Sequence, residues 1–266
     1  MQGLLNVNDV RVKVESIHAT VTSDASVQRL NGRFDGNAKP AVNVVKGGNV
    51  DVAQKSTFVI LACPPDVMKA ILSEEGMQAA LKGKLLISIL AGSTTQDMEQ
   101  ALGINQDYGD DRCWIVRTLP NLAVASNASA TAVEVSERPP PKAMTDLVDA
   151  FFEQLGGIVH VPASLMNAST VLCGSAPAYV ALFLDGMIDG AVAAGVPREK
   201  ADAMTAQMLM STAAMLKTQR ASALRESICA MPGCTVQGNL TLEEGSVRGV
   251  SAKAMKVSIE AASKLG

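Results

Sequence analysis

The sequence predicts an α/β domain with a mainly parallel sheet, followed by an all-α domain. Over the first 160 residues, short β-rich runs alternate with helix-like stretches. Beyond about residue 163, β runs almost disappear, and Ala, Met, Leu, Glu and Lys dominate. The length of 266 residues, 48% of them hydrophobic, suffices for two modest cores. We therefore expect one domain at residues 1–163 and a second at 164–266.

The composition argues against several classes of protein. A formal net charge of −3 lacks the basic excess of a nucleic-acid binder. No uninterrupted apolar run reaches about 18 residues, and the N-terminus carries no charged-then-apolar leader, so we expect neither a membrane span nor a secretory signal. The five cysteines form no C-x-x-C pair and there are only two histidines, which favours no metal site. A cytoplasmic, reducing setting is the default expectation.

The elements of the first domain follow from local patterns. Apolar and polar residues alternate at 10–14 and 17–21, which is typical of half-buried strands, whereas continuous apolar runs indicate strands buried on both faces. Gly47 and Gly48 follow no predicted strand and are interpreted as a turn. We expect further strands at 57–62, 85–90, 114–117, 130–135 and 158–161, and helices at 26–33, 66–72, 94–102 and 143–155.

The second domain shows helical spacing throughout. Val180, Leu184 and Ile188 begin one long apolar pattern, which residues 195–198 interrupt. Further helices are expected at 201–216 and 246–265, with a break at 231–233.

An ordered set of motifs covers nearly the whole chain. Residues 174–179 (G-S-A-P-A-Y) resemble the G-S-G-P-A-Y segment of pyrroline-5-carboxylate reductases. Residues 232–236 and 242–248 resemble that family's P-G-G-x-T and L-E-x-G-x-R segments, and residues 184–191 and 195–198 keep its spacing. Residues 85–92 and 119–121 resemble its I-S-x-x-A-G and M-P-N segments. The chain is therefore identified as a member of that family.

The resemblance implies a function and an architecture. The family reduces the cyclic imine pyrroline-5-carboxylate to proline with NADPH or NADH. It combines a Rossmann-like N-terminal domain with a helical C-terminal domain that forms a homodimer. Each active site is implied to lie in a cleft between the cofactor domain and the helical dimer.

Thr235 is the catalytic candidate that the resemblance implies. It lies eight residues before Glu243, the spacing of the family threonine that hydrogen-bonds the ring nitrogen. A hydroxyl suits this task because it can donate or accept as the imine becomes an amine. The alternative is that Thr235 is the N-cap of a helix after the Pro-Gly turn.

The resemblance also implies a set of substrate-binding residues: Ser175, Ala176, Met231, Pro232, Gly233 and Cys234. The sequence departs from the family here, because S/T-P-G-G is replaced by Ala230-Met231-Pro232-Gly233. Proline has no N–H to offer a carboxylate. The sequence therefore predicts a substrate that differs from a simple amino-acid-like imine.

The cofactor candidates lie at the ends of predicted strands, where open parallel sheets bind ligands. They are Ser23, Ala62, Cys63, Pro64, Ala91, Gly92 and Asn121. Ser23 is expected to contact the ribose or its 2′-phosphate, and because Asp24 only follows the strand tip, NADP(H) is preferred. The alternatives are an N-cap role for Ser23 and ordinary turn chemistry for the others.

Two departures weaken the predicted cofactor site. Pro64 stands where the family usually has lysine, so a cation is lost. No G-x-G-x-x-G loop occurs in the chain, and residues 3–5 resemble the end of the family's first helix. The first strand of such a fold is normally central, so we expect a gap in the sheet, or residues 10–14 replacing that strand. NADP(H) binding is expected to be weak or absent.

Three functional hypotheses remain open at this point. The first is an NAD(P)H-dependent reductase of a cyclic imine with an impaired cofactor site. The second is a repurposed enzyme that catalyses a non-redox cyclisation or isomerisation in the same dimer cleft. The third is a non-catalytic dimeric paralogue.

Overall fold

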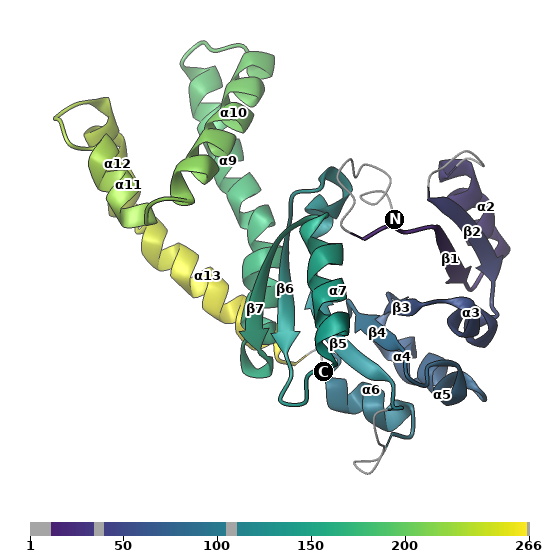
Figure 1. The fold of residues 1–266 in the computed structure, drawn as a ribbon. Coiled ribbons are helices and arrows are strands. Elements are labelled where there is room, and N and C mark those ends of the chain that lie inside the picture. The colour runs from purple at the N-terminus through teal and green to yellow at the C-terminus, as the bar shows by residue number, and fades with distance from the viewer. Residues whose placement is uncertain (1–11, 35–39, 105–110, 265–266) are drawn as a thin grey trace. The chain divides into compact units, whose positions relative to one another are not determined.

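The computed structural model describes residues 12–34, 40–104 and 111–264 (Figure 1). The chain forms two compact units. The first comprises Met1–Gly174 and Ile259–Gly266, and the second comprises Ser175–Ser258.

The first unit is an α/β domain built on two sheets. β1 and β2 form a two-stranded parallel sheet, and the other strands form a five-stranded sheet in the order β3-β4-β5-β6-β7. β3, β4 and β5 are parallel, β6 is antiparallel to β5, and β7 is parallel to β6. The strands are β1 (Ser16–Val21), β2 (Ala41–Lys46), β3 (Phe58–Leu61), β4 (Leu85–Ser88), β5 (Trp114–Leu119), β6 (Ser129–Val135) and β7 (Gly156–Pro162).

The break between the two sheets lies where a doubly wound fold has its first strand. In the order 3-2-1-4-5-6, the first strand lies between strands two and four. β2 and β1 correspond to strands three and two, and β3, β4 and β5 to strands four, five and six. Among the described residues, β1 and β3 are not joined by a common sheet. Residues 1–11 lie outside the described residues, so the expected gap in the sheet stays a prediction.

Two expectations about this region are wrong. Residues 12–15 are not part of a strand, which begins only at Ser16, so they do not replace the central strand. Residues 10 and 11 lie outside the described residues. Val14 instead packs against the apolar cluster under helix α7 (Lys142–Glu153). A strand also precedes Gly47 and Gly48, because β2 ends at Lys46. This strand was missed because only Val42 and Val44 are half-buried, which gives a short and weak alternation in the sequence.

The apolar core lies on both faces of the five-stranded sheet. Leu86 and Ile115 pack on one face, in a cluster with residues of helices α4 to α6, whereas Leu85, Ile87 and Val116 pack on the other, against α7. Successive strand residues point to opposite faces, so burial on both explains the continuous apolar runs. The helices are α2 (Asp24–Arg33), α3 (Asn49–Lys55), α4 (Pro65–Leu72), α5 (Met77–Ala80), α6 (Thr95–Ala101) and α7.

Gly156 allows β7 to begin directly against β6. Its φ is +147°, and a Cβ placed there would lie 2.1 Å from the backbone oxygen of Ser129. We expect Gly156→Ala to lower the free energy of unfolding by at least about 2 kcal/mol, because backbone cannot move aside as a side chain does. Denaturant unfolding measures this. The neighbouring Gly157 has nothing within 4 Å of its Cβ position, so Gly157→Ala is the matched control; equal losses for both variants would contradict the prediction.

The C-terminal part of the chain is helical, as expected. A short 3-10 turn, η2 (Ala163–Leu165), leads into α8 (Met166–Ser169) and then the π-helix η3 (Thr170–Ser175). Two shorter helices, α11 and α12, were not resolved by the sequence pattern. The remaining helices are α9 (Ala176–Ala193), α10 (Arg198–Leu216), α11 (Ala221–Ile228), α12 (Cys234–Glu244) and α13 (Val247–Ala262).

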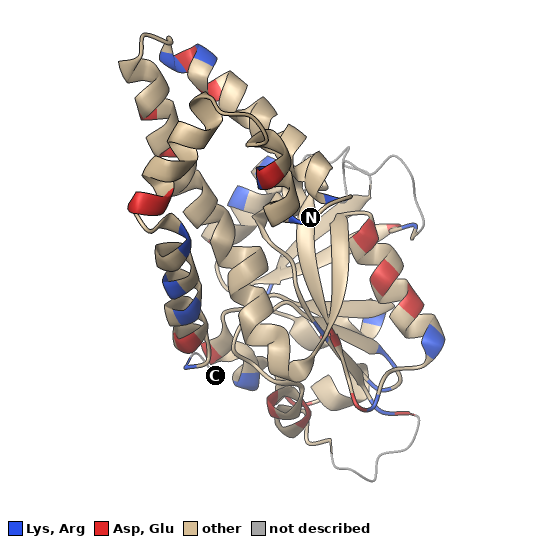
Figure 2. Cartoon of the chain, turned by 90° about the vertical axis from the view of Figure 1, so that its left-hand side faces the viewer, with Lys and Arg blue, Asp and Glu red and all other residues tan. Residues whose placement is uncertain are grey.

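Helices α9 and α10 expose large apolar side chains. Leu182 is 75% exposed, Met204 67% and Met210 66%. In Figure 2 the helical region contains long tan stretches without charged residues. By length and composition alone, the helical stretch Ala163–Ala193 could cross a membrane, with a mean hydropathy of 1.6. The stretch is not an uninterrupted apolar run, because polar residues and two aspartates interrupt it.

Candidate active site

Three turns of the first unit lie at one edge of the five-stranded sheet. Because β3, β4 and β5 are adjacent and parallel, their carboxyl ends meet at the same edge. The turn after β3 holds Ala62, Cys63 and Pro64, the turn after β4 holds Ala91 and Gly92, and the turn after β5 holds Asn121. Gly92 has a φ of +81°, which favours glycine. The structure therefore brings together six of the seven residues predicted to bind the cofactor.

Ser23 lies at the end of β1, in the two-stranded sheet. Its side chain is the N-cap of α2, accepting a hydrogen bond from the Ser26 backbone N–H at 3.2 Å. The N-cap interpretation of Ser23 is thereby confirmed, and its contact with a ribose stays a prediction. Next to this cap, Lys46 at the end of β2 forms an ion pair with Asp24 at 2.6 Å.

Asn121 connects two motifs that are far apart in the sequence. Its Nδ2 donates a hydrogen bond to the carbonyl oxygen of Cys173 at 2.9 Å, across 52 residues. Its Oδ1 accepts one from the backbone N–H of Ala123 at 3.0 Å, which caps the 3-10 helix η1 (Leu122–Ser126). The segment containing Pro120 and Asn121 is thus held against the π-helix that leads to Ser175.

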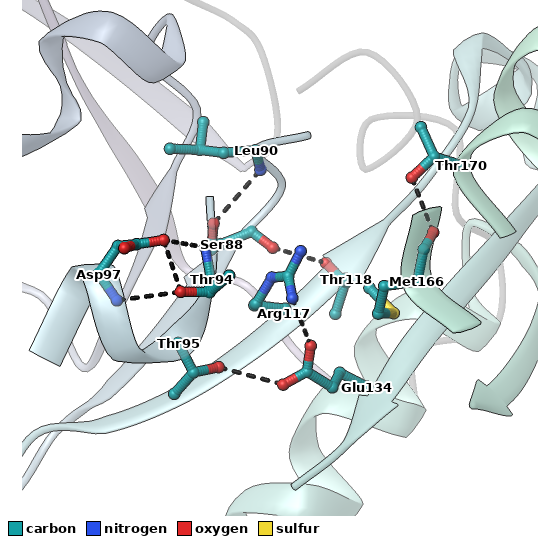
Figure 3. A network of polar contacts seen from close by, with 10 residues as sticks. All are labelled: Ser88, Leu90, Thr94, Thr95, Asp97, Arg117, Thr118, Glu134, Met166 and Thr170. Carbon is teal, nitrogen blue, oxygen red and sulfur yellow. Dashed lines mark hydrogen bonds and ion pairs between the residues drawn. The ribbon is translucent and has the colours of Figure 1, made fainter. Parts of the chain in front are cut away.

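A buried ion pair lies beneath the turn after β4 (Figure 3). Arg117 on β5 and Glu134 on β6 are 2.6 Å apart, and their side chains are only 7% and 6% exposed. Glu134 also accepts a hydrogen bond from the hydroxyl of Thr95, in the first turn of α6, at 3.1 Å. The pair therefore anchors the N-terminus of α6 to the sheet.

The N-terminus of α6 is closed by a capping box formed by Thr94 and Asp97. Hydrogen bonds from the side chain and then from the backbone of Thr94 lower the pKa of Asp97, with a smaller contribution from the charge of Arg117. Helix α6 and the turn containing Ala91 and Gly92 are thus fixed at both the cap and the underlying ion pair.

Thr235 lies in the first turn of α12, in the second unit. The N-cap of this helix is Gly233, so the alternative interpretation of Thr235 as the N-cap is wrong. Thr235 is exposed, and among the described residues its hydroxyl has no hydrogen-bond partner. Met231, Pro232 and Gly233 precede the helix in an exposed loop, with Met231 79% exposed, and Cys234 is the first residue of α12.

The other predicted substrate residues, Ser175 and Ala176, lie where the π-helix η3 ends and α9 begins. Both are half-buried. The predicted substrate residues thus occupy two places, the start of α9 and the loop before α12. Near that loop, a groove of about 270 Å³ separates α11 from α12, and the Nδ2 of Asn239 donates a hydrogen bond to the Sγ of Cys229 at 2.6 Å across it.

The cysteines of the first unit are poor nucleophiles. Burial raises the pKa of Cys113 to about 12, and burial is also the largest cause of the raised pKa values of Cys63 and Cys173. Among the residues that the structure describes, no three His, Cys, Asp or Glu side chains gather as metal ligands. The chemistry of the candidate site therefore rests on hydroxyl and backbone groups.

Comparisons with known proteins extend this picture. The family model described as pyrroline-5-carboxylate reductase dimerisation matches residues 163–265, and the model described as NADP oxidoreductase coenzyme F420-dependent matches residues 4–92. The chain is 39% identical over 233 residues to the pyrroline-5-carboxylate reductase of Lophium arboricola, covering 86% of this chain and 72% of that protein. It is 35% identical to the Neurospora crassa enzyme, covering 93% and 80% of the two chains.

The chain belongs to the pyrroline-5-carboxylate reductase family.

Solved structures of pyrroline-5-carboxylate reductases share the fold. The Plasmodium falciparum enzyme, determined with NADP bound, superposes with a TM-score of 0.80 at 23% identity, and the comparison covers 100% of this chain and 92% of that one. The Coxiella burnetii enzyme gives a TM-score of 0.79 at 25% identity, covering 94% and 88%. The fold class, a Rossmann-like domain followed by a helical dimerisation domain, is thereby confirmed.

The motifs shared with pyrroline-5-carboxylate reductases did not reveal the contacts that organise the site. The Arg117–Glu134 pair escaped the sequence analysis, although two charged residues inside otherwise apolar strands were a signal that could have found it. The only signal of the bond from Asn121 to Cys173 was indirect: Pro177, four residues after Cys173, has no N–H to donate to its carbonyl.

Proposed function

We propose that the protein reduces a cyclic imine of the pyrroline class with NADP(H). The observation that carries the proposal is the meeting of three motif-bearing turns at the carboxyl edge of β3, β4 and β5, in a member of this family. When bound, the nicotinamide supplies the hydride. Ala62, Cys63, Pro64, Ala91 and Gly92 are the residues proposed to hold that end of the cofactor.

Thr235 is proposed to orient the imine nitrogen. Its hydroxyl is exposed and has no partner among the described residues, so it is available to a ligand. A hydroxyl donates to a nitrogen lone pair and accepts from an N–H, so it can follow the nitrogen through reduction. The residues proposed to contact the rest of the substrate are Ser175, Ala176, Met231, Pro232, Gly233 and Cys234.

The cofactor site is proposed to be impaired at the pyrophosphate. No G-x-G-x-x-G loop occurs in the 266 residues, and within the described ranges β1 and β3 share no sheet. Pro64 also provides no cation. Ser23 remains the proposed contact to the ribose or 2′-phosphate, so we expect weak but measurable preference for NADPH.

The working form is proposed to be a cytoplasmic homodimer. Residues 163–265 match the dimerisation model, and α9 and α10 expose Leu182, Met204 and Met210 to an extent that is unusual for a monomer. A subunit interface on these helices would also account for the apolar stretch Ala163–Ala193. Only 11% of the most apolar part of this stretch is buried within one chain.

Isothermal titration calorimetry with NADPH tests the cofactor proposal. We expect a dissociation constant in the high micromolar to millimolar range and a small thermal shift, since RT ln(1 + [L]/Kd) is below about 1.5 kcal/mol at tenfold excess over Kd. NADH is the matched ligand, lacking only the 2′-phosphate. Absence of both heat and thermal shift at millimolar NADPH would remove the reductase proposal.

A second candidate is a non-redox enzyme that cyclises or isomerises a small molecule near Thr235. The two sheets, which are not joined in the part of the chain that the structure describes, favour it, because an impaired cofactor site would leave the helical unit and the exposed Thr235 hydroxyl unaffected. Turnover of a pyrroline-type substrate without any nicotinamide would support this candidate, and strict dependence on NADPH would reject it.

A further inference from the structure

The side chain of Asn121 is engaged at both ends by protein groups. Oδ1 caps η1 through the N–H of Ala123, and Nδ2 binds the carbonyl of Cys173. The Asn121 backbone N–H donates to the Oγ of Ser129 at 3.1 Å, and that oxygen lies 3.0 Å from the Thr131 hydroxyl. Ser129 and Thr131 are 2% and 1% exposed. Asn121 is therefore anchored in the buried polar groups of β6.

The acceptor of this bond lies in an unusual stretch of helix. Thr170–Ser175 is a π-helix, in which the hydrogen bonds span five residues instead of four. In a regular helix the donor to the Cys173 carbonyl would be the residue four positions on, which is Pro177 and has no N–H, so this carbonyl needs another donor. The Nδ2 of Asn121 supplies that donor to Cys173. The π-helix and Asn121 thus stabilise one another.

The position of the Cys173 carbonyl also affects Ser175 and Ala176, because these candidate substrate residues follow Cys173 closely in the chain. Cys173 is followed by Gly174, then by Ser175 and Ala176, which the family motif marks for substrate contact. A shift of the Cys173 carbonyl shifts the following peptide units directly, without any side-chain contact. The bond to Asn121 therefore sets where this short segment begins.

We infer that Asn121 is a positioning residue for the imine substrate, acting through the Cys173 carbonyl and the π-helix. The inference rests on the proposed reductase function. It differs from the predicted role of Asn121 as a cofactor ligand, because it places the effect of substitution on the substrate and not on NADPH. Asparagine suits the position because it offers both an acceptor for η1 and a donor for Cys173.

The test compares two Asn→Asp variants. Asn121→Asp keeps an oxygen that can cap η1 but sets a carboxylate oxygen against the Cys173 carbonyl. Asn127, at the other end of η1, also donates from Nδ2 to a backbone carbonyl, that of Gln154, at 2.8 Å, and its φ of +53° suits both Asn and Asp. Asn127→Asp is thus a matched control for losing one amide donor.

The test has three measurements. They are NADPH affinity by calorimetry, steady-state kcat and KM for pyrroline-5-carboxylate, and the rate of amide hydrogen exchange over Thr170–Ser175. Asn121→Asp is expected to raise KM about tenfold or more and to speed exchange over Thr170–Ser175 by a similar factor. The NADPH dissociation constant should stay within twofold of the wild-type value. Asn127→Asp should change none of the three. If Asn121→Asp does not fold, Asn121→Ser, which keeps a capping oxygen but lacks the amide donor, takes its place.

Two results would overturn the inference. A rise in the NADPH dissociation constant as large as the rise in KM would make Asn121 a direct cofactor ligand. Unchanged KM with unchanged exchange would leave it a cap of η1 only. If the wild-type chain reduces no imine, the proposed function fails, while hydrogen exchange still reports separately whether Asn121 holds the π-helix.

Discussion

Replacing Thr235 with alanine is expected to lower kcat/KM for a cyclic imine about 100- to 1000-fold, the loss typical of removing one donor aimed at a reacting group. The hydroxyl is exposed and without a partner among the described residues, so the substitution removes no internal bond. The melting temperature should therefore stay within about 1 °C of the wild-type value. Steady-state kinetics and thermal unfolding measure the two effects.

Thr235→Ser and Cys234→Ser are the matched variants. Serine at position 235 keeps the hydroxyl and should recover most of the activity, whereas Cys234→Ser changes the neighbouring exposed residue and should have little effect. A Thr235→Ala variant with wild-type kcat/KM would assign the reaction to other residues. If activity fell equally in the Ser and Ala variants, the methyl group and not the hydroxyl would be responsible.

Replacing Arg117 with methionine is expected to lower the free energy of unfolding by about 3–5 kcal/mol, because it leaves the Glu134 carboxylate buried without its partner. Denaturant unfolding measures the loss. The double variant Arg117→Met, Glu134→Leu removes both charges and should recover much of the stability, since an apolar pair of similar volume often replaces a buried ion pair without net cost.

An exposed ion pair provides the control for this measurement. Lys142 and Asp146 on α7 are 2.8 Å apart but 86% and 59% exposed, so Lys142→Met should change stability little. An Arg117→Met variant as stable as Lys142→Met would show that the carboxylate of Glu134 finds water or another donor. The Nε of Arg117 already lacks a hydrogen-bond partner among the described residues, so the pair is not fully satisfied even in the wild type.

Strands with strong patterns were predictable from sequence, and weakly patterned ones were not. Hydrophobicity alone located the apolar runs that became β3 and β4 to within two residues. β4 is buried throughout, whereas Ile60 of β3 is 38% exposed. β2 has only Val42 and Val44 half-buried and belongs to a two-stranded sheet, so little burial marks its sequence. Residues 12–15 show the converse error, because alternation predicts a strand only where a partner strand is present.

The site was predictable where it depends on strand ends and not where it depends on long-range contacts. A parallel sheet collects the carboxyl ends of neighbouring strands, so the strand pattern alone suffices to group Cys63, Gly92 and Asn121. The partner of Asn121 is a main-chain carbonyl in a π-helix, and no side-chain motif identifies which donor reaches it. The N-cap of α12 was also assigned two residues too late, because a glycine cap forms no side-chain bond.

The exposed apolar face of α9 and α10 has a chemical consequence of its own. Its thioether side chains include Met187, Met204, Met208, Met210 and Met215. Oxidants convert a solvent-accessible thioether to a polar sulfoxide, and a sulfoxide disrupts methionine-rich packing. Burial between subunits would shield these sulfur atoms, so the unpaired chain is the form most open to oxidative damage. Assembly would then also determine how long these methionines stay reduced.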